Sequence, residues 1–136
     1  MARLDGMQRL RGVVCAREVV GDGARGQHEE RALGLEVALA EGFWTRLRGV
    51  LGRGELGVDQ GLLLTPCAQV HSFGLGYALD VVYLDGSGRV LKCVAGLKPW
   101  RVSGAWGARR VLELGGGALL RWDIRAGDRL SWEGMA

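Results

Sequence analysis

The sequence predicts a mainly β protein that folds as an antiparallel sandwich or a distorted barrel. Short apolar segments follow one another from residue 33 to residue 132, with turn signals about every eight to twelve residues. Glycine supplies 24 of the 136 residues and stands between the apolar runs without a fixed period, which favours turns over low complexity. Strands and long helices do not alternate, so a parallel α/β sheet is not expected.

Length and composition indicate one folded domain. Hydrophobic residues make up 48% of the chain and charged residues 24%, which allows a buried core and excludes global disorder. The net charge is +3, but the arginines are spread along the chain and often adjoin acids, as in Arg17-Glu18 and Asp128-Arg129. Because phosphate binding requires clustered cations, nucleic acid is not an expected partner.

The cysteines indicate a reducing environment and no metal or other cofactor. Cys15, Cys67 and Cys93 are odd in number and widely separated, and no CxxC pair is present. The apolar run at residues 13–16 is shorter than a signal-peptide core of about 7 to 15 residues. We therefore expect a cytoplasmic chain without a membrane span.

The first part of the chain is expected to be an N-terminal extension, residues 1–30, which is partly flexible and precedes a single β domain at residues 31–134. Residues 13–20 can form a strand, whereas residues 21–27 have the glycine and polar content of a loop. Residues 33–40 alternate apolar and small or polar side chains, as a strand does.

The period changes at residues 43–53, where the sequence predicts an amphipathic helix. Its apolar stripe consists of Phe43, Trp44, Leu47, Val50 and Leu51. Arg46 and Arg53 lie one heptad apart on the other face. The helix either closes one end of a β core or uses these two arginines to hold an anion or a partner's carboxylate.

The rest of the chain has the pattern of strands. The most continuous apolar run, residues 79–84, is expected in the middle of a sheet, and Asp85-Gly86-Ser87-Gly88 predicts a hairpin to residues 89–94. A short helix is expected near residues 117–123. The other predicted strands are residues 62–64, 69–73, 99–102, 110–114 and 129–132.

These segments together resemble the DUF192 family, also catalogued as UPF0127. The resemblance depends on the order and spacing of several pieces: Phe43-Trp44-x-Arg46-Leu47-x-Gly49-x-Leu51-x-Arg53, Gly61-Leu62-Leu63, Val70-His71-Ser72-Phe73, Leu79-Asp80-Val81-Val82-Tyr83-Leu84-Asp85, Gly88-x-Val90, Val111-Leu112-Glu113-Leu114-x-Gly116 and Gly127-Asp128. It implies a compact sandwich similar in shape to a jelly roll and no established activity. Because members often carry export signals, the resemblance leaves an envelope association open.

The sequence departs from the family pattern beside the candidate site. Leu75, Gly76 and Ala78 occupy places where the family usually has a methionine, a basic or polar residue and a proline. Gly115 stands where a proline is common. If the basic residue contributes to a ligand site, this chain lacks that contribution.

Asp80 and His71 are the first candidate site residues. Burying a carboxylate inside an apolar run costs several kcal/mol unless it is paired or accepts hydrogen bonds. Arg101, Arg110, His71 or backbone N–H groups are the available partners of Asp80. Asp80 therefore either fixes the strands or orients His71 for proton transfer.

Two further groups of residues are candidates for a metal site or a ligand site. His71 follows Cys67 by four residues, and both are metal-ligand types, but no further Cys or His is near in sequence. Trp100 and Arg101, together with Arg110, place aromatic rings beside guanidinium groups, which suits flat anionic or sugar-like ligands. Trp106 is expected to be partly exposed.

Three functions are compatible with these residues. The first is a non-enzymatic accessory or binding module that holds a small polar ligand or a peptide in a cleft lined by His71, Asp80, Trp100, Arg101 and Arg110. The second is a hydrolase that uses His71 and Asp80, with Cys67 if a metal assists. The third is a structural or protein-interaction module.

Overall fold

The predicted mainly β fold is confirmed. A computed structural model describes residues 2–21, 24–42, 46 and 48–133. Within them lie one short helix, α2 (Ala118–Trp122), and a series of strands. The strands are β1 (Arg9–Gly21), β2 (Ala24–Ala32), β3 (Glu36–Ala40), β4 (Gln60–Leu64), β5 (Gln69–His71), β6 (Leu79–Leu84), β7 (Val90–Leu97), β8 (Val102–Gly104), β9 (Arg110–Gly115) and β10 (Arg129–Glu133).

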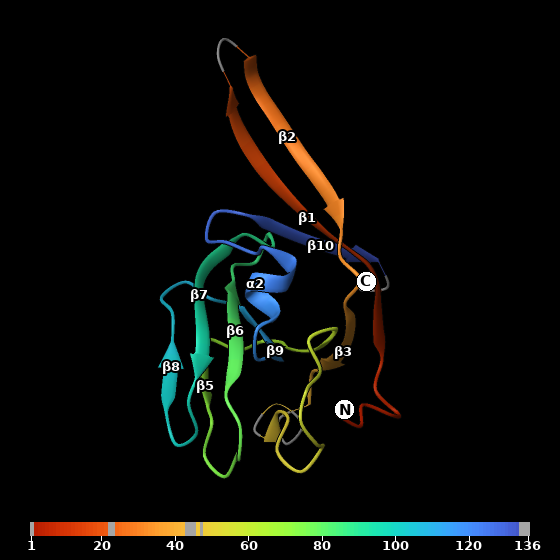
Figure 1. Ribbon diagram of the computed structural model, residues 1–136, viewed down its shortest axis with the longest axis vertical. Coiled ribbons are helices and arrows are strands. Elements are labelled where there is room, and N and C mark those ends of the chain that lie inside the picture. Colours follow the sequence, from red (N-terminus) through yellow and green to blue (C-terminus); the bar gives the residue numbers. More distant parts are fainter. Residues whose placement is uncertain (1, 22–23, 43–45, 47, 134–136) are drawn as a thin grey trace.

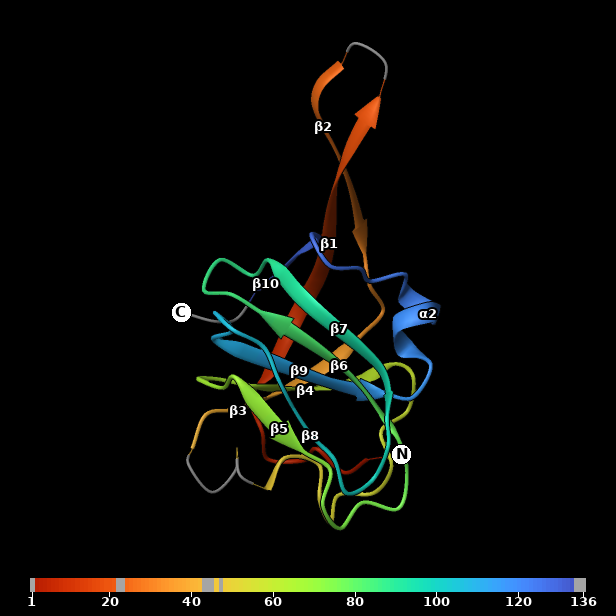
Figure 2. The same ribbon diagram turned by 90° about the vertical axis from the view of Figure 1, so that its left-hand side faces the viewer.

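Most of the strands form one curled sheet, shaped like half a barrel (Figure 2). Its order is β10-β1-β3-β4-β9-β6-β7, and β2 pairs with β1. β3 and β4 run parallel, and the other neighbours are antiparallel. β5 and β8 form a separate antiparallel ribbon, which carries His71 at its end.

β6 occupies the position that its apolar run predicts. It lies between β7 and β9, and all six of its residues are buried. The following turn is closed by the N–H of Asp85, which donates to the carbonyl of Arg89 at 3.0 Å, and by Asp85 Oδ1, which accepts from the N–H of Ser87 at 2.8 Å. The predicted hairpin at residues 85–88 is therefore confirmed.

The N-terminal part of the chain differs from the expectation. β1 and β2 form a long hairpin that projects from the body of the molecule (Figure 1). The prediction of a loop at residues 21–27 is wrong, because Gly21 pairs with Ala24 and strand β2 begins at Ala24. β1 also belongs to the main sheet, and its residues Leu10, Val13 and Cys15 are buried.

Several boundaries are shifted. The strand predicted at residues 33–40 begins at Glu36, and that predicted at residues 69–73 ends at His71. The strand predicted at residues 99–102 is replaced by a turn, after which β8 begins at Val102. Of the helix predicted at residues 43–53, residues 43–45 and 47 lie outside the described residues. Arg46 and Arg48 have helical backbone, and residues 49–52 form a turn.

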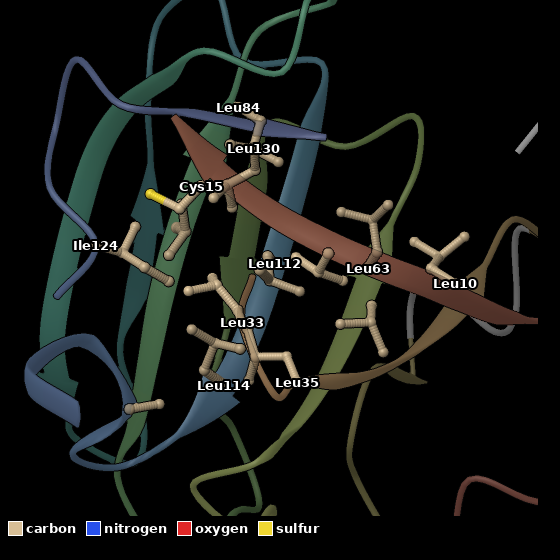
Figure 3. Packing of buried hydrophobic residues seen from close by; sticks show 14 of the residues in the cluster. Leu10, Cys15, Leu33, Leu35, Leu63, Leu84, Leu112, Leu114, Ile124 and Leu130 are labelled. Atoms are coloured by element: carbon tan, nitrogen blue, oxygen red, sulfur yellow. The ribbon is translucent and has the colours of Figure 1, made fainter. Parts of the chain in front are cut away.

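Buried side chains cover both faces of the sheet, because successive residues of a strand point to opposite sides. One face, which we call the helix face, adds Val82, Leu84, Leu112 and Leu114 to a buried cluster that also includes Ala118 and Leu119 of α2. Figure 3 shows Leu84, Leu112 and Leu114 within this cluster. The other face, which we call the pocket face, includes Val81, Tyr83 and Val111. It is covered by the N-terminal residues, the segment 50–56 and the β5–β8 ribbon, through Ala2, Leu4, Val50, Leu56 and Val70.

Candidate functional site

Asp80 lies on the helix face and holds the fold together. Its side chain is buried, since the residue is 2% exposed. Oδ1 accepts the N–H of Gly96 and Oδ2 accepts the N–H of Leu119, both at 2.9 Å. Of the partners that the sequence predicts as possible for Asp80, the backbone N–H groups are the ones observed. These two hydrogen bonds connect β6 with β7 and α2.

His71 lies on the opposite side of the sheet from Asp80. It is half-buried at the end of β5 and lines a pocket that Asp80 does not reach. The catalytic pair in which Asp80 orients His71 is therefore not formed. A hydrolase mechanism based on that pair has no orienting group.

The remaining predicted residues are not gathered in one cleft. Trp100 stacks on Phe73 with the ring centroids 5.8 Å apart, and Phe73 lies 5.2 Å from the ring of His71. Arg110 lies on the helix face, with its guanidinium 5.5 Å from the ring of Trp132. Arg101 is exposed. The structure thus connects His71 with Trp100 and separates both from Asp80 and Arg110.

A pocket of about 190 Å³ opens on the pocket face, and we call it the Glu113 pocket. It is lined by residues of β4, β5 and β9, and by Arg46 and the segment 48–51. Its lining residues are Arg46, Arg48, Gly49, Val50, Leu51, Leu64, Cys67, Gln69, Val70, His71, Phe73, Leu75 and Glu113.

Glu113 projects from β9 and is 3% exposed. Burial raises the pKa of its carboxyl group from 4.5 to about 8. Within the described residues the carboxyl group has no hydrogen-bond or ion-pair partner that would offset this cost. Gly49 lies directly against the carboxyl group of Glu113. A Cβ atom at position 49 would lie only 2.7 Å from Glu113 Oε1, so a larger residue does not fit there without a shift. The chain therefore keeps a buried acid in a pocket at a cost in stability.

Two arginines lie at the rim of the pocket. Arg46 donates through Nε to the carbonyl of Glu41 at 3.0 Å and through Nη1 to the carbonyl of Pro66 at 2.6 Å. Arg48 donates through Nε to the carbonyl of Leu51 at 2.7 Å. Neither guanidinium forms an ion pair with a described carboxylate. Hydrogen bonds to the backbone hold both guanidinium groups in place, and no carboxylate of the described residues is paired with them.

Cys67 and His71 both line the pocket, so the loop between β4 and β5 brings them to one site. The thiol of Cys67 donates to the carbonyl of Gln69 at 3.0 Å, and burial raises its pKa. A raised pKa keeps a thiol protonated, which disfavours its use as a nucleophile or metal ligand at neutral pH. Among the described residues, no group of three His, Cys, Asp or Glu side chains is placed to hold a metal ion.

The family model of DUF192, described as “Uncharacterized ACR”, matches residues 25–132. The chain belongs to the DUF192 family. The matched range includes Asp80, Glu113 and the whole Glu113 pocket. A search of the curated proteins finds no match.

Two solved structures are similar to this DUF192 chain. A protein of unknown function from Novosphingobium aromaticivorans DSM 12444 has a TM-score of 0.71 and 24% identity, covering 95% of this chain and 89% of that one. A “putative transcription regulator” from Sinorhizobium meliloti 1021 has a TM-score of 0.67 and 21% identity, covering 92% and 97%. At these identities the similarity supports the shared fold. No helix in the described part of the chain is long and apolar enough to span a membrane.

Glu113 is not among the site residues that the sequence predicts for this DUF192 protein, whereas Asp80 is. Glu113 also interrupts an apolar run, Val111-Leu112-Glu113-Leu114, and all four residues are buried. The argument that a buried carboxylate needs a partner therefore applied to both residues. The sequence predicts Arg46 and Arg53 as possible anion ligands, and of these only Arg46 lines the pocket, together with Arg48.

Proposed function

We propose that this DUF192 protein is a binding module for a small anionic ligand, which is held in the Glu113 pocket between the rim arginines and the buried carboxyl group. One observation carries the proposal. Among the described residues, Glu113 is almost fully buried without a partner, and the two guanidinium groups at the rim of its pocket form no ion pair.

The charges of the lining residues favour an anion. With its pKa raised to about 8 by burial, Glu113 is mostly protonated at pH 7 and adds little negative charge. Arg46 and Arg48 each add a positive charge. The protonated carboxyl group has an O–H to donate, and the guanidinium groups retain N–H donors beyond those bonded to the backbone. An anionic oxygen would satisfy these donors.

The proposal can be tested by titrating ¹⁵N-labelled protein with sodium acetate and with inorganic phosphate, at constant ionic strength. We expect saturable shifts of the backbone amide signals of Gly49, Cys67 and His71. Arg46→Gln and Arg48→Gln should each weaken binding roughly tenfold or more, because a hydrogen bond to a charged group contributes about 1.5 to 3 kcal/mol. Arg11→Gln, which removes the same charge from an exposed site on β1, should leave binding unchanged.

Two outcomes would overturn the proposal. The first is the absence of saturable shifts with either anion, and the second is binding that survives both arginine substitutions. Ethylammonium chloride serves as the cationic control. Stronger binding of ethylammonium than of acetate would indicate that Glu113 ionises to hold a cation.

Acid catalysis is a second candidate function, favoured by the pKa of Glu113. A general acid is most effective when its pKa lies near the working pH, and a value of about 8 meets this condition. In the hydrolysis of an ester, water would attack the acyl carbon as the bond to the leaving oxygen breaks. Glu113 would donate its proton to that oxygen and regain one from the attacking water, without the pair of His71 and Asp80. Hydrolysis of phenyl acetate that is lost in Glu113→Gln would support this function, and equal rates in both proteins would exclude it for that substrate.

A further inference from the structure

The mouth of the Glu113 pocket is continued by a stack of exposed aromatic rings. Phe73 lines the pocket and is 43% exposed, and Trp100 beside it is 65% exposed. Their ring centroids lie 5.8 Å apart with an angle of 25° between the planes. We call this pair the aromatic shelf. Because Phe73 belongs to both features, a ligand that extends out of the pocket meets the shelf.

The backbone at Trp100 indicates that the shelf is built at a cost. Trp100 has a φ angle of 62°, in the left-handed region that bulky residues rarely adopt. An exposed tryptophan gains little from burial to offset such strain. Strained residues of this kind persist where the surrounding structure fixes them, and they cluster at ligand-binding sites.

Ser72 supplies the contacts that fix Trp100. Ser72 is fully buried, and its carbonyl accepts the N–H of Trp100 at 3.1 Å. The hydroxyl group donates to the carbonyl of Lys98 at 2.6 Å and accepts the N–H of Arg101 at 2.9 Å. The N–H of Ser72 donates to the carbonyl of Arg101 at 2.9 Å. These hydrogen bonds hold the turn at residues 98–101 against Ser72, which precedes Phe73, and Ser72 thereby positions the shelf.

We propose that the aromatic shelf holds a flat aromatic group of the ligand whose anionic end lies in the Glu113 pocket, so that the ligand class is an aryl acid. This inference rests on the proposed function. Phe73 and Trp100 are stacked, and their centroid distance lies within the range of about 4.5 to 7 Å that aromatic pairs prefer. A planar ring can continue this stack, whereas a saturated ring of similar size cannot.

The experiment compares benzoate, cyclohexanecarboxylate and acetate, titrated against the ¹⁵N-labelled full chain. We expect benzoate to bind roughly two- to tenfold more tightly than cyclohexanecarboxylate, the range that an aromatic pair contributes beyond its buried area. Trp100→Asn should bring this ratio close to one and leave the affinity for acetate unchanged. Asparagine is chosen because it tolerates the left-handed region.

Two further variants keep the inference falsifiable. Phe73→Leu removes the other ring of the shelf and decides the question if Trp100→Asn does not fold. Trp106→Ala removes a tryptophan that is fully exposed outside the shelf, and it should keep the preference for benzoate. A preference that is absent in the parent protein, or that survives in both shelf variants, would overturn the inference.

The outcomes for the two proposals are distinguishable. If acetate binds and is lost in Arg46→Gln while benzoate has no advantage, the shelf inference fails and the anion pocket stands. If neither acetate nor benzoate binds saturably, both proposals fail.

Discussion

Asp80 and Glu113 are buried carboxyl groups on neighbouring strands, and their surroundings are opposite. In the pairing of β6 with β9, Asp80 is opposite Leu114 and Val81 is opposite Glu113, so the two acids point to different faces of one sheet. Asp80 accepts two backbone N–H groups. Glu113 has no such partner among the described residues, and its pKa is raised to about 8 by burial.

The different surroundings of Asp80 and Glu113 distinguish the helix face, which stabilises the fold, from the pocket face, which holds the candidate binding site. On the helix face, the cost of burying Asp80 is offset by hydrogen bonds that connect three elements. On the pocket face, the cost of burying Glu113 is not offset within the described structure. Groups with strongly shifted pKa values are concentrated at functional sites, where residues needed for function often lower the free energy of unfolding. This contrast supports the proposal that Glu113, and not Asp80, belongs to the binding site.

The largest expected effect is a pH-dependent gain in stability when Glu113 is replaced by glutamine. Below pH 4.5, both the folded and the unfolded chain hold the proton. Between pH 4.5 and about 8, only the unfolded chain releases it, so the free energy of unfolding falls as pH rises. At about 1.4 kcal/mol per pKa unit, the loss reaches an upper bound of about 5 kcal/mol at pH 8. Glu113→Gln removes this loss.

Urea unfolding at pH 4, 6 and 8 measures the effect. The advantage of Glu113→Gln over the parent should be greatest at pH 8 and close to zero at pH 4. Glu55→Gln is the matched control, because Glu55 is exposed and its replacement should not change the slope with pH. Parallel stability curves for Glu113→Gln and the parent would show that the buried acid has a partner in the folded protein.

Asp80→Ala is expected to have the next largest effect, with the opposite sign. It leaves the N–H groups of Gly96 and Leu119 without an acceptor. At about 1.5 to 3 kcal/mol per hydrogen bond to a charged group, the loss of stability is about 4 kcal/mol. Asp80→Asn retains one acceptor oxygen and should lose about half as much. Urea unfolding at pH 7 measures both.

Binding measurements on Asp80→Asn sharpen the comparison. Because Asp80 faces α2, the folded variant should bind acetate as the parent does. A variant that keeps its stability and loses acetate binding would return Asp80 to the candidate site and contradict the division between the two faces.

The fold was predictable where local chemistry determines it. The apolar run of β6 and the Asp85 turn specify a central strand and its hairpin without reference to the rest of the chain. β2 could not be found in this way, because its sequence Ala-Arg-Gly-Gln-His-Glu-Glu-Arg-Ala is polar on both sides and shows no alternation. Its extended backbone is fixed by pairing with β1, which is a contact between strands rather than a property of the segment.

The site was predictable only in part, for a related reason. His71, Trp100 and Arg46 were identified from residue type and pattern. The partners of Asp80 and the lack of partners for Glu113 depend on which strands are neighbours and in which register. A shift of one residue in β9 would exchange the faces of Glu113 and Leu114. The sequence therefore identifies buried acids, and the sheet pairing determines which of them is satisfied.

The third prediction concerns the pH dependence of anion binding. As pH rises through about 8, Glu113 ionises, loses its O–H donor and adds a negative charge to the pocket. The affinity for acetate should then fall, by up to about tenfold per pH unit. Glu113→Gln keeps N–H donors at every pH and should lose this dependence. Titrations at pH 6, 7, 8 and 9 measure it, and a pH dependence of the same size in Glu113→Gln would contradict the assignment to Glu113.

The smallest expected effect distinguishes a tryptophan on each face. Trp122, beside the helix-face core, donates its indole N–H to the carbonyl of Val58 at 2.7 Å, and Trp122→Phe should cost about 1 kcal/mol by removing that hydrogen bond. Trp100→Asn loses one aromatic stack, worth about 0.5 to 1.5 kcal/mol, and relieves backbone strain of about 1 to 2 kcal/mol. The two terms have opposite signs, so the free energy of unfolding of Trp100→Asn should stay within about 1 kcal/mol of the parent. Urea unfolding measures both variants. A larger loss in the free energy of unfolding for Trp100→Asn than for Trp122→Phe would show that Trp100 stabilises the fold, as Asp80 does, and is not kept for binding.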